Sequence, residues 1–149
     1  MEEFNTIDKV KELFRAKGLG GDNDIYLALL KDFGKQSGMV AGMEYPYTGM
    51  LVDITDTGIG MYHLVQPKFS LRVLIENLVI DKDSYTFLSN DDIKSVQVKK
   101  FALLDSKRKL LIIKTNDKKT HYLYGSVADT LIPYNSENMQ KLLAKYSSK

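Results

Sequence analysis

The stretch Ser84–Lys100, SYTFLSNDDIKSVQVKK, constrains the fold of this sequence more than any other. It begins with an apolar run at Tyr85–Leu88, passes through a polar turn at Ser89–Asp92 and becomes apolar again at Ile93. Apolar residues that alternate with polar ones are typical of a strand with one buried face. Ile93 is out of phase with Val96, which indicates a bulge just after it. The stretch therefore predicts a strand, a turn and a second strand.

The next part of the chain predicts more antiparallel sheet. A polar turn is expected at Asp105–Lys107, followed by a short apolar strand at Leu110–Ile113 that we expect to be central and covered on both faces. Asn116–Asp117 has the composition of a hairpin turn, and His121–Tyr124 would be the last strand. A loop over Gly125–Tyr134 then leads to a helix.

The C-terminal helix is the clearest single element of the sequence. Asn135 or Ser136 can cap its start. Four apolar residues follow at the helical spacing i, i+3, i+4 and i+7, namely Met139, Leu142, Leu143 and Tyr146. This one-sided apolar face predicts that the helix packs on the sheet, with roughly 1.5–3 kcal/mol gained for each fully buried side chain.

The N-terminal part predicts helix rather than sheet. Residues 6–17 have a one-sided apolar pattern with Thr6 or Asn5 as N-cap, and Gly18 ends the helix. A second short helix is expected over Ile25–Phe33. Together these predict a helical hairpin over 1–37, as an appendage to a main domain over 38–149.

The main domain opens with strands expected at Met39–Tyr45, Thr48–Thr55 and Ile59–Val65. Residues 66–83 have apolar residues on too many sides to separate strand from helix, and we interpret them as an insertion that ends in a polar turn at Asp81–Asp83.

Two stretches carry a resemblance to a known family. Thr48–Tyr62, TGMLVDITDTGIGMY, resembles the second and third strands of bacterial pleckstrin-homology-like (PH-like) domains, and Tyr85–Val96, YTFLSNDDIKSV, is similar to their I-P-Y-x-D-I-x-S-V signature. The resemblance covers about residues 39–147. It implies an α+β fold, in which about seven antiparallel strands form a bent sheet or partly open barrel capped by a C-terminal helix.

The same resemblance implies a binding or scaffolding module without a catalytic centre. Lipid-binding PH domains carry clustered Lys and Arg between their first two strands, whereas the corresponding loop here, Tyr45–Tyr47, has no base. Phosphoinositide binding is therefore not expected. We expect an extended peptide of a partner protein to bind between the closing helix and the adjacent sheet edge.

Charge suggests an alternative partner. The chain has a net charge of +2, but residues 94–119 contain eight Lys and one Arg against two Asp, a local charge of +7. Nucleic acid or an anionic surface could bind there, with Phe101, Tyr122 and Tyr124 available to stack bases. The whole chain has only three Arg and a pI near 8.6, which does not favour a nucleic-acid-binding domain.

Composition limits the chemistry. A chain of 149 residues with 44% hydrophobic residues is long enough for one domain, and the absence of cysteine excludes disulfides and thiol chemistry. No apolar run could cross a bilayer and no signal peptide is recognisable, so a cytoplasmic location is expected.

Few residues are candidates for catalysis. Asp56-Thr57-Gly58 matches the catalytic turn of retropepsin-like proteases, but a hairpin turn explains it better. His63 and His121 lack the spacing of metal ligands. Asp91 and Asp92 are interpreted as turn residues. The sequence thus predicts no catalytic residue, no metal and no cofactor, and assigns no ligand-binding residue.

Overall fold

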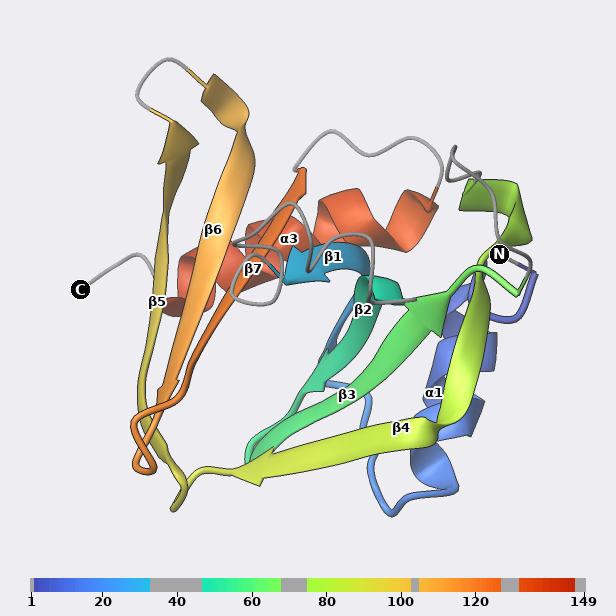
Figure 1. Ribbon diagram of the computed structural model, residues 1–149, viewed down its shortest axis with the longest axis horizontal. Helices are drawn as coiled ribbons and strands as arrows, with labels where there is room; N and C mark the ends of the chain where they lie inside the picture. Colours follow the sequence, from blue (N-terminus) through green and yellow to red (C-terminus); the bar gives the residue numbers. More distant parts are fainter. Residues whose placement is uncertain (1, 33–46, 68–74, 103–104, 127–131, 147–149) are drawn as a thin grey trace.

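The computed structural model describes residues 2–32, 47–67, 75–102, 105–126 and 132–146 (Figure 1). These residues form an α+β protein in which helices lie near both ends of the chain and strands lie between them. The elements are α1 (Ile7–Arg15), β1 (Ile25–Asp32), β2 (Tyr47–Ile54), β3 (Gly58–Val65), η2 (Ile75–Asn77), β4 (Val79–Ser89), β5 (Ile93–Ala102), β6 (Asp105–Thr115), β7 (Thr120–Ser126) and α3 (Pro133–Tyr146).

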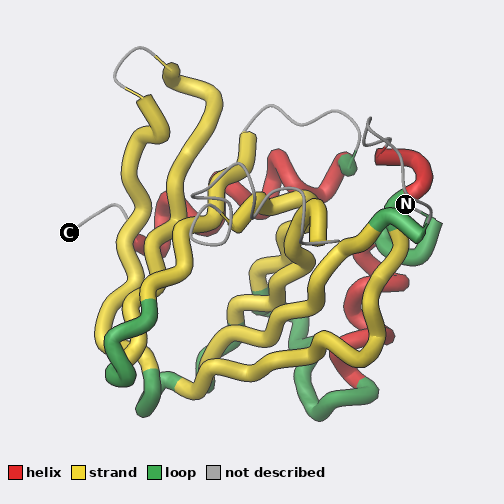
Figure 2. The backbone as a smooth tube through the Cα atoms, in the orientation of Figure 1, coloured by secondary structure: helices red, strands yellow, loops and turns green. Residues whose placement is uncertain are grey.

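The strands form one antiparallel sheet in the order β4-β3-β2-β1-β7-β6-β5. β4 and β5 stand at opposite ends of this order and do not pair with each other, so the sheet is not a closed barrel. Figures 1 and 2 show β2–β4 as one half of the sheet and β5–β7 as a second half at an angle to it. The expected α+β fold with an antiparallel sheet and a C-terminal helix is confirmed at this level.

Strands β1 to β3 are buried on both faces, which gives the molecule two apolar clusters. We call the cluster that includes residues of β6 and α3 the inner cluster, and the cluster that includes α1 the outer cluster. The inner cluster contains Ile25, Leu27, Met50, Val52, Ile54, Ile59, Met61, Leu111, Ile113, Met139 and Leu142. The outer cluster contains Phe4, Val10, Phe14, Tyr26, Ala28, Leu51, Tyr62, Leu64, Leu78, Ile80, Ile132 and Tyr134. Alternate side chains of one strand thus enter different clusters.

The expected second helix over Ile25–Phe33 is wrong, because most of these residues form β1. Since alternate side chains of β1 enter the two clusters, the strand is apolar on both sides. Such a strand lacks the alternation of a half-buried strand and can reproduce helical spacing. The expected hairpin over 1–37 is therefore a helix followed by a strand of the sheet. The boundary at 37/38 and the expected strand Met39–Tyr45 lie outside the described residues.

Helix α1 begins and ends as its sequence predicts. Thr6 is the N-cap, and its side chain accepts a hydrogen bond from the Lys9 N–H. At the other end Gly18 has φ +82°, and the Leu19 N–H donates to the Phe14 carbonyl at 3.0 Å. This is the Schellman arrangement, in which glycine takes the left-handed position without a Cβ penalty.

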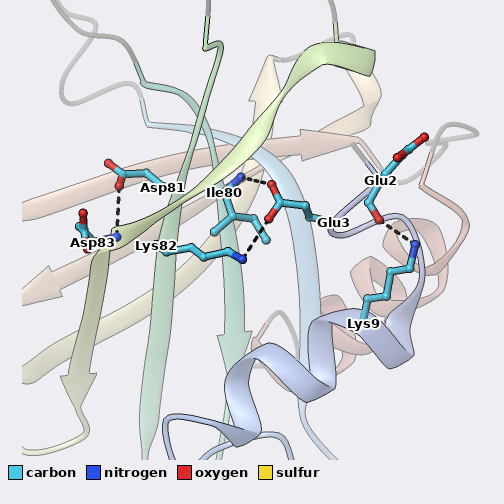
Figure 3. Close-up of polar contacts among 7 residues, drawn as sticks. All are labelled: Glu2, Glu3, Lys9, Ile80, Asp81, Lys82 and Asp83. Carbon is cyan, nitrogen blue, oxygen red and sulfur yellow. Dashed lines mark hydrogen bonds and ion pairs between the residues drawn. The ribbon is translucent and has the colours of Figure 1, made fainter.

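The first residues of the chain are attached to the edge of β4 (Figure 3). The Ile80 N–H donates to the Glu3 carboxylate at 3.3 Å, and Lys82 Nζ lies 3.5 Å from the same carboxylate. Lys9 Nζ donates to the carbonyl of Glu2 at 2.8 Å and ties this segment to α1. Part of the β4 edge is therefore covered by the chain itself.

The polar turn expected at Asp81–Asp83 is wrong, since these residues lie inside β4. They accompany a shift in the register of β4 against β3. The Asp83 N–H donates to the Asp81 carboxylate, and the Ser84 hydroxyl donates to the Asp81 carbonyl while accepting from the His63 N–H. Turn-forming side chains here produce an irregularity within a strand. Of the insertion expected over 66–83, residues 68–74 lie outside the described residues.

Most of the remaining predictions are confirmed. The strands expected at 48–55, 59–65, 110–113 and 121–124 are parts of β2, β3, β6 and β7, and the register shift between Ile93 and Ser95 is the expected bulge. β6 lies between β5 and β7, as expected for a central strand. The turn at Asp105–Lys107 is wrong, because Ala102 already pairs with Asp105 and these residues open β6.

The C-terminal helix α3 places Met139 and Leu142 in the inner cluster, as its spacing predicts. Neither Asn135 nor Ser136 is its N-cap, because the helix begins at Pro133. The Asn135 amide is buried instead, accepting from the Ala28 N–H at 2.8 Å and donating to the Ala28 carbonyl at 2.9 Å. These two bonds join α3 to the middle of β1.

We predict that Asn135→Ala lowers the free energy of unfolding by about 2–4 kcal/mol, because it leaves a buried backbone N–H and C=O of Ala28 without partners. Urea denaturation measures the change. Gln140→Ala, on an exposed position of the same helix, is the matched control and should change stability by less than about 0.5 kcal/mol. Equal effects of the two substitutions would show that the Asn135 bonds contribute nothing specific.

Candidate functional site

Strand β5 is an edge of the sheet and pairs along one side, with β6. Its register is continuous from Ser95 to Lys100, so this stretch presents a regular row of backbone groups on its other side. In the described part of the chain no second strand pairs with it. The β4 edge differs, because the Ile80 N–H already donates a hydrogen bond to the Glu3 carboxylate and because the strand is irregular near Asp81. The two edges of the sheet are therefore not equivalent.

Apolar side chains lie beside the β5 edge. Ile93, Val96 and Val98 of β5 and Tyr146 of α3 are half-buried and pack on the inner cluster. α3 lies against β5, and Figure 1 shows its C-terminal end reaching that strand. Burial raises the pKa of the Tyr146 phenol. The site thus has a partly exposed apolar face next to an unpaired strand.

Lysines gather at the end of β5 that begins with Ile93. An open hollow of about 440 Å³ is lined there by Lys94, Lys114, Thr115, Asn116, Lys118 and Lys119. We call this the lysine hollow. Its lining contains four cations and no acid, and the nearby Asp117 carboxylate lies 3.8 Å from Lys119 Nζ. Lys99 and Lys109 lie further along the β5–β6 pair, so the basic segment 94–119 is only partly brought together.

Two turns are joined beneath the lysine hollow. The Asn116 N–H donates to the Asp92 carbonyl at 2.9 Å, and its side-chain amide donates to the Asp91 carbonyl at 2.7 Å. The Asp92 N–H donates to the Ser89 carbonyl, which confirms the predicted turn at Ser89–Asp92. These bonds fix the β6–β7 turn against the β4–β5 turn. They therefore hold Lys94 and Lys118 on adjacent parts of one surface.

The β6–β7 turn places a lysine in an unfavourable backbone conformation. Lys118 has φ +69°, a left-handed value for which glycine or asparagine is preferred. The Thr115 hydroxyl donates to the Asp117 carboxylate, and this bond, with the Lys119 N–H, holds the pKa of Asp117 below its usual range. Local hydrogen bonds in the turn thus favour the ionised form of the Asp117 carboxyl group.

A second notable group is Asp53, in β2 opposite Tyr26 and Gly60. Its side chain is fully buried, on the face of the sheet that α1 covers. Neither of its carboxyl oxygens has a hydrogen-bond partner of ordinary geometry among the described residues, although Asp24 and the Gly20 N–H lie near enough to act on it. Burial, and next the Asp24 carboxyl, raise the pKa of Asp53 to about 8.

The packing over Asp53 is close. A Cβ on Gly60 would lie 2.7 Å from Leu19 Cδ1 and 3.3 Å from Phe14 Cε1, so a larger residue there would displace the side chains that α1 and the segment after it pack on the sheet. The Tyr26 hydroxyl donates to the Gly21 carbonyl at 2.9 Å, and burial, followed by the Asp53 carboxyl, raises the pKa of Tyr26. This packing thus separates the Asp53 carboxyl group from solvent, which favours its neutral form.

The residues that the sequence analysis considered for catalysis or metal binding lie in different elements of the structure. Asp56 lies exposed in the β2–β3 turn, where its carbonyl accepts from the Asn90 amide. Thr55 closes this turn through its hydroxyl, as expected for a structural hairpin. His63 is half-buried in β3, and the side chain of His121 lies outside the described residues. Within the described ranges, no three His, Asp or Glu side chains are grouped to hold a metal ion.

Comparisons with known proteins gave no match: no family model, no curated protein and no solved structure is significantly similar to this chain. None of the described helices has the length and apolar character needed to span a membrane.

Sequence reasoning missed two residues that the structure makes prominent. Asp53 lies in a stretch of β2 that reads as an ordinary strand, and only the position of α1 buries it. Asn135 was assigned to a helix cap, although it bonds a residue 107 positions earlier. An acid at the inward position of a strand was the one available signal for Asp53.

We predict that the free energy of unfolding falls as the pH rises from 3.8 toward 8, because the folded state keeps a proton on Asp53 that the unfolded state loses at its ordinary pKa. The slope is at most roughly 1.4 kcal/mol per pH unit. Urea denaturation across this range measures it. Asp53→Asn should remove most of the slope, whereas Asp56→Asn should retain it. A slope in Asp53→Asn equal to that of the original protein would contradict the assignment.

We predict that Lys118→Asn raises the free energy of unfolding by about 0.5–1 kcal/mol, because asparagine tolerates a left-handed φ better than lysine does. Chemical denaturation at moderate salt measures the gain. Lys99→Asn, on an exposed position of β5 with ordinary backbone, serves as control and should give no gain. A loss of stability in Lys118→Asn would mean that the lysine side chain stabilises the turn.

Proposed function

We propose that this protein is a non-catalytic binding module that takes an extended peptide of a partner protein along β5. The observation that supports this most is the edge itself, a regular strand unpaired on one side in the described residues. Backbone groups on such an edge pair readily with an added strand. The other edge of the sheet is partly occupied by Glu3.

The side chains around β5 suggest how such a peptide is recognised. Successive residues of an added strand point to opposite faces of the sheet. On one face they would meet Val96, Val98 and Tyr146, which are half-buried and apolar. On the other they would lie beside Gln97 and Lys99, which are exposed. The proposal therefore requires a peptide with alternating apolar and polar residues.

As part of this proposal we assign the chain a PH-like fold. The support is a bent antiparallel sheet followed by a C-terminal helix that packs on it. Strand order and the two PH-like sequence stretches agree with this assignment. A fold of this kind does not by itself assign a ligand, so the function rests on the β5 edge.

Two alternative functions use other residues. Nucleic acid or an anionic surface could bind the basic segment 94–119, and the lysine hollow is the observation in its favour. A labelled single-stranded oligonucleotide that stays bound at physiological salt would support this alternative. The second alternative is a retropepsin-like protease with Asp56 as its catalytic residue. In that case the protein would cleave peptides, and Asp56→Asn would abolish the cleavage.

The peptide proposal is tested by selection and a backbone scan. A displayed library of random 12-residue peptides is selected against the protein, and a bound peptide is resynthesised with one backbone N-methyl group at each position in turn. Strand addition predicts that binding weakens about tenfold at every second residue, because alternate peptide N–H groups bond to β5. Isothermal titration calorimetry measures each affinity.

As a control, each side chain of the peptide is replaced by alanine at the same positions, without N-methylation. This separates the loss of backbone hydrogen bonds from the loss of side-chain contacts. An N-methyl scan without a two-residue period would contradict strand addition. Failure to select any peptide that binds with a Kd below about 100 μM would contradict the peptide function itself.

A further inference from the structure

We propose that the partner peptide carries a run of Asp or Glu residues that binds in the lysine hollow, just beyond the Ile93 end of β5. This inference rests on the proposed function and adds the chemical class of the partner to it. Four lysines line this hollow, which makes it a strongly charged depression of the surface.

The position of the hollow connects it to the β5 edge. Lys94 belongs to β5 itself, next to the bulge between Ile93 and Ser95. Lys114 lies on β6, directly opposite Ser95 in the sheet register. An added strand lies on the free side of β5, opposite β6, so a peptide that continues past Ile93 comes first to Lys94. To reach Lys114 on β6 and then Lys118 and Lys119 of the β6–β7 turn, its next residues would cross over the Ile93 end of β5 into the hollow that these four lysines line.

The charge around the hollow is only partly compensated. Four lysines line it, while the Asp117 carboxylate lies 3.8 Å from Lys119 Nζ and Asp91 and Asp92 lie in the turn that Asn116 joins to it. Exposed charges interact over roughly 8 Å at physiological salt, so the cations act together on a ligand in the hollow. Complementary charges of this kind increase the association rate and fix the register of a bound segment.

Carboxylates suit this hollow better than a phosphate group does. Specific phosphate sites use the planar fork of Arg, or a lysine together with a cradle of backbone N–H groups. The described residues of the lining include no Arg, and the Asn116 N–H already donates to the Asp92 carbonyl. Four separate ammonium groups around an open hollow instead suit several acidic side chains spread along an extended segment.

The turn also retains a lysine where another residue would be more stable. Lys118 has φ +69° at a position that favours glycine or asparagine. Its side chain lines the hollow. A contribution to binding is a physical reason to keep a charge there despite its conformational cost.

The test uses the peptides selected from the random 12-residue library and requires no known partner. We expect Asp and Glu to be enriched in the selected peptides at one end, next to the alternating segment. We also expect Lys114→Glu to weaken the binding of a selected peptide about tenfold at 50 mM salt and less at 500 mM salt. Lys17→Glu, which makes the same change of net charge at an exposed position just after α1, is the matched control and should leave the affinity within twofold.

Lys118→Asn is a second variant that removes a charge and fits the left-handed turn, so its fold is not in question. It should weaken binding about threefold or more. Selected peptides that show period-two N-methyl sensitivity without acidic enrichment would overturn this inference and leave the peptide function intact. If no selected peptide shows that period, the peptide function itself fails. Tight binding of labelled oligothymidine at physiological salt, lost in Lys114→Glu, would overturn the inference in favour of nucleic acid.

Discussion

Two hydrogen bonds between the Asn135 side chain and the Ala28 backbone join helix α3 to β1, the strand at which the two halves of the sheet meet. β1 pairs with β2 up to Leu27 and again at Leu30, and with β7 at Lys31 and Asp32. Ala28 lies in the irregular stretch between Leu27 and Leu30. Its N–H and C=O are satisfied by the Asn135 amide, which acts as a short substitute for a neighbouring strand. Because Asn135 is in the first turn of α3, the same bonds set where that helix crosses the sheet.

The position of α3 in turn defines the site at β5. Met139 and Leu142 anchor the helix in the inner cluster, and Tyr146 then reaches the apolar side of β5. On the opposite face, α1 and the segment after it cover the outer cluster and seal Asp53 from water. Glu3 meanwhile occupies part of the β4 edge. The chain therefore buries both faces of β1–β3 and covers part of one edge, while the β5 edge stays regular and beside exposed lysines.

Local patterns predicted much of the fold, and long-range packing decided the rest. The bulge after Ile93, the turn at Ser89–Asp92 and the apolar face of α3 depend on neighbouring residues, and the sequence revealed them. β1 could not be recognised, because a strand covered on both faces has no alternation to read. Asn135 and the buried Asp53 were missed since their surroundings come from distant parts of the chain. The lysine hollow depends on two turns held together by Asn116, which spacing alone does not show.

Hydrogen exchange of the β5 amides, with and without a selected peptide, tests the central claim most directly. Amides on the unpaired side of the stretch Ser95–Lys100 should exchange rapidly in the free protein and become protected about tenfold or more when the peptide is bound. Amides of the β4 edge should keep their rates. Protection at β4, or a bound peptide that leaves the exchange of β5 unchanged, would contradict binding by strand addition at this edge.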